Sequence, residues 1–340
     1  MPALVAVVRT LRRTLGRVRY PREDWNTSCD LRCDSPVTAA DPADVSSRPA
    51  RLAVGIVGAG RVGSVLGAAL QRAGHRVVAV SAVSDASRRR AADLLPAAEV
   101  LTPQEVLAAA ELALLTVPDD ALPDLVEGLV AAGAVRPGQL VVHTSGRYGV
   151  TVLESATRAG GLPLALHPAM TFTGRPEDLV RLAGACFGVT APEPLRPIAD
   201  ALVLEMGGDP QWVAEDQRVL YHAALAGGAN HLSTLVNESV DQLRRCGVAE
   251  PERLLAPLLG AALDNALRSG DSALTGPVAR GDAGTVAAHL AVLREVSPHA
   301  AGAYLAMARL TADRALAAGL LRPAAAEALL DVLAEGAADR

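Results

Sequence analysis

The sequence predicts an α/β Rossmann-like domain with a parallel sheet, followed by an all-α domain. Three observations support this fold class. Short apolar runs alternate with helical segments between residues 51 and 215, a glycine-rich turn follows the first run, and only helical patterns appear from residue 216 onward. A chain of 340 residues is long enough for two domains with substantial cores. We therefore predict domains at 51–215 and 216–340.

Residues 1–50 differ from the rest of the chain. Residues 1–22 carry six arginines and no acid, and a stretch rich in Ser, Asp, Pro and Cys follows. A signal peptide places its charges before the apolar core, whereas here a short apolar piece comes first. We predict a disordered N-terminal extension at 1–50, with a surface-binding amphipathic helix at 3–19 as the alternative.

The composition excludes several kinds of protein. All 32 residues in the Lys+Arg count are arginine, so a lysine Schiff base, a lysine general acid and a P-loop lysine are impossible. The net charge is −5 and aromatic residues make up 2%, which argues against a nucleic-acid partner. The sequence contains no uninterrupted run of about 18 or more apolar residues, so it predicts no membrane span. Four cysteines predict neither a disulfide framework nor a metal site. Together with the lack of a predicted membrane span, this favours a cytoplasmic protein with reduced thiols.

The first element of the folded chain is a buried strand that enters a glycine-rich turn. The run RLAVGIVG leads into Gly58, Gly60 and Gly63, a helical pattern follows, and a second strand is predicted at 77–83. This order is the dinucleotide-binding fingerprint. The first glycine permits the turn, the second admits the pyrophosphate, and the third lets helix and strand pack closely. Arg61 and Val62, which open the helix, complete the predicted cradle.

The end of the second strand favours NADP as the cofactor. An NAD site places an acid there, but this strand ends in Ser84 and is followed by Arg88 and two more arginines. A 2′-phosphate is bound by hydroxyl and guanidinium donors. A helix aims only one or two of three consecutive residues at a ligand, so we assign the 2′-phosphate to Ser84 and Arg88. The alternative is that these arginines form a solvated helix face.

Further strands are predicted at 111–117, 140–144, 162–166 and 183–191. Ligands bind beyond the carboxyl ends of such strands. Three of these ends carry polar groups beside a turn-forming residue, and the residues concerned are Pro118, Asp119, Ser145 and His167. We expect the first three along the nicotinamide side of the cofactor.

The second domain opens with one predicted helix of about thirty residues that ends at Gly247, and further helices are expected at 251–269, 283–294, 298–318 and 323–337. His222 and Asn230 are eight residues apart on the long helix and share a face. The later segment LTGPVARGD joins two helices, with Asp282 predicted as an N-cap. In this domain order the substrate is expected in the cleft between the domains.

The stretches GIVGAGRVG, TVPDDAL, HTSG, LALHPAMTF, YHAALAGGANHL and LTGPVARGD together resemble a family with a Rossmann-like domain and a helical domain of unknown function. The resemblance covers about residues 51–320. It places the chain in the 6-phosphogluconate dehydrogenase-like group, beside pyrroline-5-carboxylate reductase and ketopantoate reductase. It implies an NADP-dependent reductase, and a ketopantoate-like keto acid as one substrate.

The chain departs from several of these relatives because it has no lysine. In ketopantoate reductases and β-hydroxyacid dehydrogenases, a lysine on the first long helix of the second domain donates the proton. Here His222 is the first candidate for that role, and His167 is the second. A proton donor contributes typically 10²–10⁴ in rate. A protonated imine needs no strong acid beside it, so the missing lysine also favours an imine substrate.

The sequence therefore predicts an NADP-dependent oxidoreductase that acts on a small, acidic carbonyl or imine compound. His222, Asn230 and His167 would orient and protonate the substrate, and Arg280 would clamp its carboxylate. The rival hypothesis is a non-catalytic NADP-binding or dimeric scaffold protein. Long Ala/Leu-rich helices at 298–318 and 323–337 predict a homodimer through the helical domain.

Overall fold

The computed structural model describes residues 51–338. The N-terminal extension predicted for residues 1–50 lies outside the described residues. The described chain divides after Gly227 into two compact units, and each is described by itself.

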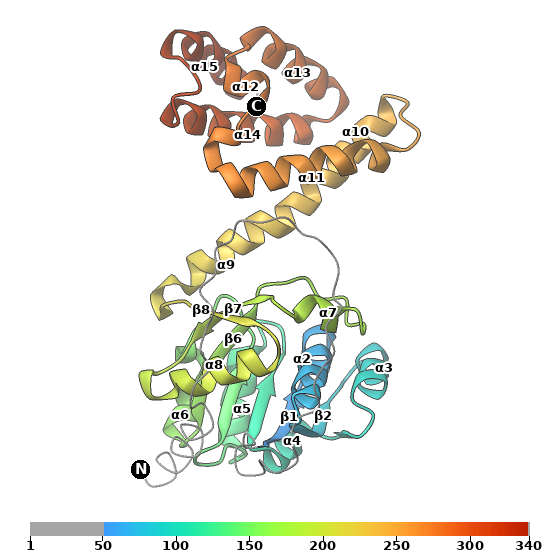
Figure 1. Ribbon diagram of the computed structural model, residues 1–340, viewed down its shortest axis with the longest axis vertical. Helices are drawn as coiled ribbons and strands as arrows, with labels where there is room; N and C mark the ends of the chain where they lie inside the picture. The colour runs from blue at the N-terminus through green and yellow to red at the C-terminus, as the bar shows by residue number, and fades with distance from the viewer. Residues whose placement is uncertain (1–50, 339–340) are drawn as a thin grey trace, which may run out of the picture. The chain divides into compact units, whose positions relative to one another are not determined.

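The first unit is built on a single eight-stranded sheet with the order β3-β2-β1-β4-β5-β6-β7-β8 (Figure 1). Neighbouring strands are parallel from β3 across to β6, β7 runs antiparallel to β6, and β8 is parallel to β7. The predicted Rossmann-like sheet is confirmed. The strands are β1 (Ala53–Val57), β2 (Arg76–Ser81), β3 (Glu99–Val100), β4 (Leu112–Leu115), β5 (Leu140–His143), β6 (Leu162–Pro168), β7 (Cys186–Thr190) and β8 (Asp209–Trp212).

Helices cover both faces of this sheet. One core cluster packs α2, α3 and α8 against the sheet, and a second packs α4, α5 and α6 against the opposite face. Successive strand residues alternate between the two cores: Leu112 and Leu114 join the first, and Ala113 and Leu115 join the second. The helices are α2 (Arg61–Arg72), α3 (Asp85–Leu94), α4 (Pro103–Ala109), α5 (Leu122–Ala131), α6 (Glu154–Arg158), α7 (Asp178–Leu182) and α8 (Arg196–Glu205).

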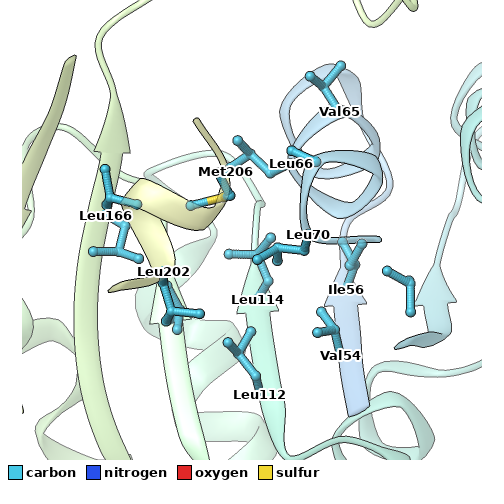
Figure 2. Close-up of a cluster of buried hydrophobic side chains, with 14 of the residues drawn as sticks. Val54, Ile56, Val65, Leu66, Leu70, Leu112, Leu114, Leu166, Leu202 and Met206 are labelled. Carbon is cyan, nitrogen blue, oxygen red and sulfur yellow. The ribbon is translucent and has the colours of Figure 1, made fainter. Parts of the chain in front are cut away.

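Aliphatic side chains form most of the contact between α2, α8 and the central strands. Figure 2 shows Leu66 and Leu70 of α2 facing Leu202 and Met206 above the strands. Each fully buried leucine stabilises the fold by about 1.5–3 kcal/mol. The packing leaves a void of about 10 Å³ there, which is too small for a ligand. Ligand binding is therefore expected at the rim of the sheet.

The first unit ends in the helix α9 (Arg218–Ala226), and a five-residue π-turn at Gly227–His231 separates it from α10 (Leu232–Arg245). The single long helix that the sequence predicts is thus interrupted. Two glycines in the segment GGANH weaken the α-helix there, because glycine has the largest backbone entropy to lose. Inserted π-turns of this kind occur frequently at functional sites.

The second unit contains only helices among its described residues, 228–338, as predicted. Its core joins α12 (Gly276–Arg280), α13 (Ala283–Val296), α14 (Pro298–Ala317) and α15 (Pro323–Ala338) through alanines and leucines. Asp282 caps α13 by accepting a hydrogen bond from the backbone N–H of Thr285 at 3.0 Å, which confirms the predicted N-cap. No helix within residues 51–338 has the length and apolar character that crossing a bilayer requires.

The helices α10 and α11 (Pro251–Ser269) bury little of their apolar surface. Val240 is the buried residue of α10, and Leu255 and Pro251 are those of α11. Six leucines of this pair are at least 40% exposed, namely Leu232, Leu235, Leu254, Leu258, Leu263 and Leu267. We call this set the α10–α11 exposed leucines.

Candidate active site

The glycine-rich turn joins β1 to α2 at the carboxyl edge of the sheet. Gly58 has a φ of 95°, and its carbonyl oxygen accepts hydrogen bonds from Gly60 N–H at 2.7 Å and from the Thr116 hydroxyl at 2.6 Å. Ser81, at the end of β2, holds the turn from the other side, because its hydroxyl accepts from Gly58 N–H at 3.0 Å. The turn is therefore fixed by its neighbours on both sides.

The two later glycines have different surroundings. A Cβ on Gly63 would lie 2.3 Å from the Thr116 hydroxyl oxygen and 2.4 Å from the Gly58 carbonyl oxygen, so a side chain is excluded there. A Cβ on Gly60 would meet only the Gly58 carbonyl oxygen, at 4.0 Å. No side chain caps α2, so its first N–H groups remain available to an anion. This arrangement fits a pyrophosphate, since the open space lies over Gly60 and the uncapped helix end.

The residues predicted to hold the 2′-phosphate already have partners within the chain. Ser84 is the N-cap of α3, where its hydroxyl oxygen accepts from Ser87 N–H at 3.1 Å. Arg88 donates from Nε to the Ala82 carbonyl oxygen at 3.4 Å and lies 4.0 Å from the Asp85 carboxylate. Both side chains are exposed, and binding a phosphate would require them to leave these contacts.

At the carboxyl end of β5, His143 is fully buried and organises the loop that follows. Its Nδ1 accepts a hydrogen bond from Ser145 N–H at 3.2 Å, so the proton lies on Nε2, which donates to the Gly149 carbonyl oxygen at 2.8 Å. Burial, together with the charge of Arg218, lowers the pKa of His143 to about 4. The imidazole is therefore neutral at pH 7 and serves to fix the loop that carries Ser145, a buried residue.

A buried arginine, Arg218, lies next to the strands β6 and β7. Arg218 is 1% exposed and donates from Nε to the Thr190 hydroxyl at 2.7 Å and from one terminal nitrogen to two backbone carbonyl oxygens at 3.1 Å, those of Ala165 and Gly188. These acceptors belong to β6 and β7. The side chain thus joins the antiparallel pair of strands and places a buried positive charge behind the histidines.

His167, near the carboxyl end of β6, forms the centre of a side-chain cluster with Tyr221 and His222 of α9. The Tyr221 hydroxyl lies 2.8 Å from His167 Nδ1, and the rings of His167 and His222 are 6.0 Å apart in a T-shaped arrangement. A Cβ on Gly146 would lie 2.7 Å from the His222 ring and 3.0 Å from His167 Nε2, so glycine is required beside them. We call these three side chains the His–Tyr cluster.

The hydrogen bond between Tyr221 and His167 has two proton arrangements. Tyr221 donates when the His167 proton lies on Nε2, and it accepts when that proton lies on Nδ1. Burial and the charge of Arg218 lower the pKa of His167 to about 4, while burial raises the pKa of Tyr221. At pH 7 both groups are neutral, and each carries a proton.

Two carboxylates fix the surrounding loops. Glu215 accepts hydrogen bonds from the backbone N–H groups of Val150 at 2.7 Å and Thr151 at 3.0 Å. Burial alone would raise the pKa of Glu215, but these hydrogen bonds outweigh it and keep the pKa below its usual range. Asp178, at the start of α7, accepts from the backbone of Thr173 and Gly174. Neither acid was predicted as part of the site.

The other predicted site residues lie in several places. Pro118 is exposed and Asp119 half-buried just past the end of β4, at the same sheet edge as the glycine turn. Asn230 lies in the π-turn and Arg280 ends α12, and both are exposed residues of the second unit. The structure thus brings His167 and His222 together, and adds Tyr221 and Arg218, which the prediction left out of the site. The signal for Tyr221 was its place beside His222 in the same segment.

Comparison with known families accounts for most of the chain. A Rossmann-like domain matches residues 37–168, and a domain of unknown function, DUF2520, matches residues 185–311. The chain is a Rossmann-like protein with a DUF2520 domain. The DUF2520 match begins just before β7, so it includes β7, β8 and the helix that carries Tyr221 and His222, whereas β6 and His167 lie in the Rossmann-like match. No curated protein matches this Rossmann–DUF2520 chain.

Solved structures share its fold. A protein described as an NADP oxidoreductase from Bacteroides fragilis is 23% identical, with a TM-score of 0.63, and the match covers 77% of this chain and 98% of that one. Protein TM1727 from Thermotoga maritima is 21% identical over 78% and 98%, with a TM-score of 0.58. A 1-pyrroline-5-carboxylate reductase from Streptococcus pyogenes is 15% identical over 78% and 98%, with a TM-score of 0.53. At these identities the likeness concerns the fold.

Proposed function

We propose that this Rossmann–DUF2520 protein is an NADP-dependent oxidoreductase that moves hydride between NADPH and a small carbonyl or imine compound. The observation that carries the proposal is that the glycine turn and the His–Tyr cluster lie at one edge of one sheet. β1 and β6 are three strand spacings apart, roughly 14 Å. The named oxidoreductases among the structural neighbours agree with this reaction class.

The residues at the turn suit a dinucleotide. Gly58, Gly60 and Gly63, with the first N–H groups of α2 at Arg61 and Val62, would hold the pyrophosphate. Pro118, Asp119 and Ser145 follow along the same edge and would line the nicotinamide side. When bound, the cofactor supplies the hydride, and the chain's own residues supply the proton and the orientation of the substrate.

His167 is the group best suited to protonate the product. Its Nε2 has no hydrogen-bond partner among the described residues, and it carries a proton in the tautomer in which Tyr221 donates to Nδ1. Giving up that proton would leave an imidazolate, which is unfavourable unless the Tyr221 proton moves to Nδ1 at the same time. His222, 6.0 Å away between ring centres, would then orient the substrate. This arrangement replaces the lysine that the chain lacks.

Asn230 and Arg280 complete the proposal as substrate-binding residues from the second unit. An exposed guanidinium binds a carboxylate through two parallel hydrogen bonds, and this favours an acidic substrate such as a ketopantoate-like keto acid or a cyclic imino acid. Arg280→Ala should raise the KM for such a substrate about ten-fold or more and leave NADPH affinity unchanged. Arg268→Ala, which removes another exposed arginine of the same unit, is the matched control.

The test of the function begins with the cofactor. Titration of the full chain by fluorescence should show NADPH binding, with NADH binding more weakly. A panel of 2-keto acids and cyclic imines is then scored by NADPH consumption. Cofactor binding without turnover on any compound would favour the scaffold hypothesis, and absence of NADPH and NADH binding would overturn the proposal.

We also propose that the protein is a homodimer. The α10–α11 exposed leucines are the reason, since two helices that leave most of their apolar side chains exposed are typical of interaction surfaces. Helices α14 and α15, on which the sequence-based expectation rested, use many of their apolar residues in the core of the second unit.

A further inference from the structure

Two arginines from different helices meet at one glycine of the loop before α7. A Cβ on Gly174 would lie 2.8 Å from both Cδ and Nε of Arg90, and 3.0 Å from Cγ of Arg61. Arg61 is the first residue of α2, and Arg90 lies in the second turn of α3. Gly174 has a φ of 79°, so a side chain is disfavoured there on backbone grounds as well.

A buried carboxylate holds this loop in place. Asp178 is fully buried and accepts hydrogen bonds from Thr173 N–H and Gly174 N–H, both at 2.7 Å, and from the Thr173 hydroxyl at 3.0 Å. The helix that Asp178 begins, α7, contacts α2, and Figure 1 shows the two side by side. The loop is therefore a fixed wall against which the stems of Arg61 and Arg90 rest.

Neither guanidinium has a hydrogen-bond or ion-pair partner within residues 51–338. Arg90 is half-buried in spite of this, and a half-buried guanidinium without an acceptor is unusual, because burying polar groups costs free energy unless they are paired. Arg88 differs, since its guanidinium contacts the Ala82 carbonyl and Asp85. Of the arginines on α3, Arg90 is thus the one that is both partly enclosed and available.

The place of this pair indicates its ligand. Arg61 directly follows the glycine turn, and the turn is hydrogen-bonded to Ser81 at the end of β2, the strand beside which a Rossmann domain holds the adenosine ribose. A phosphate monoester at that ribose carries close to two negative charges and presents three acceptor oxygens, which suits two guanidinium groups.

We propose that Arg61 and Arg90, whose stems both lie against Gly174, form the site for the 2′-phosphate of NADP and determine the choice of NADP over NAD. The proposal rests on the proposed function and replaces Ser84 and Arg88 in this role. It assigns a binding function to a segment that the cofactor fingerprint does not include.

The experiment measures Kd values for NADPH and NADH with the full-length protein and its variants. Arg61→Gln and Arg90→Gln should each weaken NADPH binding about ten-fold or more and change NADH binding less than two-fold, since NADH lacks the phosphate. Gly174→Ala should have the same selective effect, because its Cβ would displace both stems. Arg89→Gln, an exposed neighbour on α3, and Arg88→Gln should leave the NADPH preference intact.

The outcomes separate this inference from the function on which it rests. A wild-type protein that prefers NADPH, with variants at 61 and 90 that keep the preference, overturns the inference alone. Loss of the preference in Arg88→Gln, with Arg90→Gln unaffected, restores the earlier assignment. A wild-type protein without preference for NADPH overturns both the inference and the NADP part of the proposed function.

Discussion

Tyr221 and His167 share one hydrogen bond, and the position of its proton decides what the site can donate. Nε2 of His167 carries the proton only when the Tyr221 hydroxyl is the donor of this bond. A second pair in the chain has nearly the same geometry: the Tyr304 hydroxyl lies 2.9 Å from Nδ1 of His289, an exposed residue, and the two rings are also T-shaped. This pair offers an internal control.

Tyr221→Phe should remove the donor from His167 Nδ1 and let the ring exchange between its two neutral tautomers. Nitrogen-15 NMR of histidine-labelled protein measures this, because protonated and unprotonated ring nitrogens differ widely in chemical shift. We expect wild-type His167 to carry its proton on Nε2. Tyr304→Phe should change the His289 signals and leave those of His167 unaltered. A wild-type His167 protonated on Nδ1 would contradict the proposed donor.

The two buried histidines predict how stability depends on pH. Their pKa values are about 4 in the folded chain and about 6.5 for an imidazole in water, so the unfolded chain binds protons that the folded chain does not. The free energy of unfolding should be highest above about pH 6.5 and should fall as the pH drops toward 4. For fully buried His143 the loss approaches about 3 kcal/mol.

Urea denaturation between about pH 7 and about pH 4.5 checks this dependence. His143→Asn retains a donor and an acceptor and should flatten the curve, whereas His299→Gln, at an exposed histidine, should leave its slope unchanged. A wild-type protein with equal stability across this range would contradict the assignment of neutral, buried imidazoles.

Single residues were partly predictable. His167 and Ser145 stood out because polar residues followed apolar strands, and His222 stood out by its helical spacing. Arg218 gave no such signal, since it is one of 32 arginines in a chain without lysine. Its burial depends on carbonyl groups of β6 and β7, which come together only through an antiparallel pairing that the sequence pattern does not reveal.

At the scale of elements, two glycines of the turn between β1 and α2 are expected to have different roles: Gly63 in the stability of the fold and Gly60 in dinucleotide binding. Gly63→Ala should destabilise the fold by about 1–3 kcal/mol, because its Cβ would overlap the Thr116 hydroxyl and the Gly58 carbonyl. Gly60→Ala should leave the melting temperature nearly unchanged and weaken dinucleotide binding. Thermal denaturation and NADPH titration of both variants check the split. Equal destabilisation by the two alanines would argue against an open cradle at Gly60.

Elements with a strong periodic pattern were predicted well, and those defined by their neighbours were not. The central strands are apolar runs, and all appear in the sheet. β8 has the sequence DPQW, with no buried residue, and exists because it pairs with β7 at the sheet edge. The π-turn at Gly227–His231 was likewise hidden, because the apolar spacing on either side continues through it.

At the scale of the whole molecule, the α10–α11 exposed leucines predict the oligomeric state. Leu263→Glu together with Leu267→Glu, which share one side of α11, should convert a dimer into a monomer, because two charges would be buried in an apolar interface. Light scattering during size-exclusion chromatography gives the mass directly. Leu330→Glu is the matched control, because it lies on α15, one of the two helices on which the sequence predicted the dimer interface. A wild-type monomer at micromolar concentration would contradict the homodimer.

The buried guanidinium of Arg218 also fixes how the site responds to its surroundings. A guanidinium keeps its charge at every pH at which the protein is folded, whereas a buried ammonium group is easily neutralised. The contribution of Arg218 to the electrostatic potential at His167 is therefore constant, and acidification cannot remove it. Any pH dependence of the proposed reaction would then report on the histidines, the tyrosine and the substrate, and a rate profile measured on this protein would be simpler to interpret than one governed by a lysine.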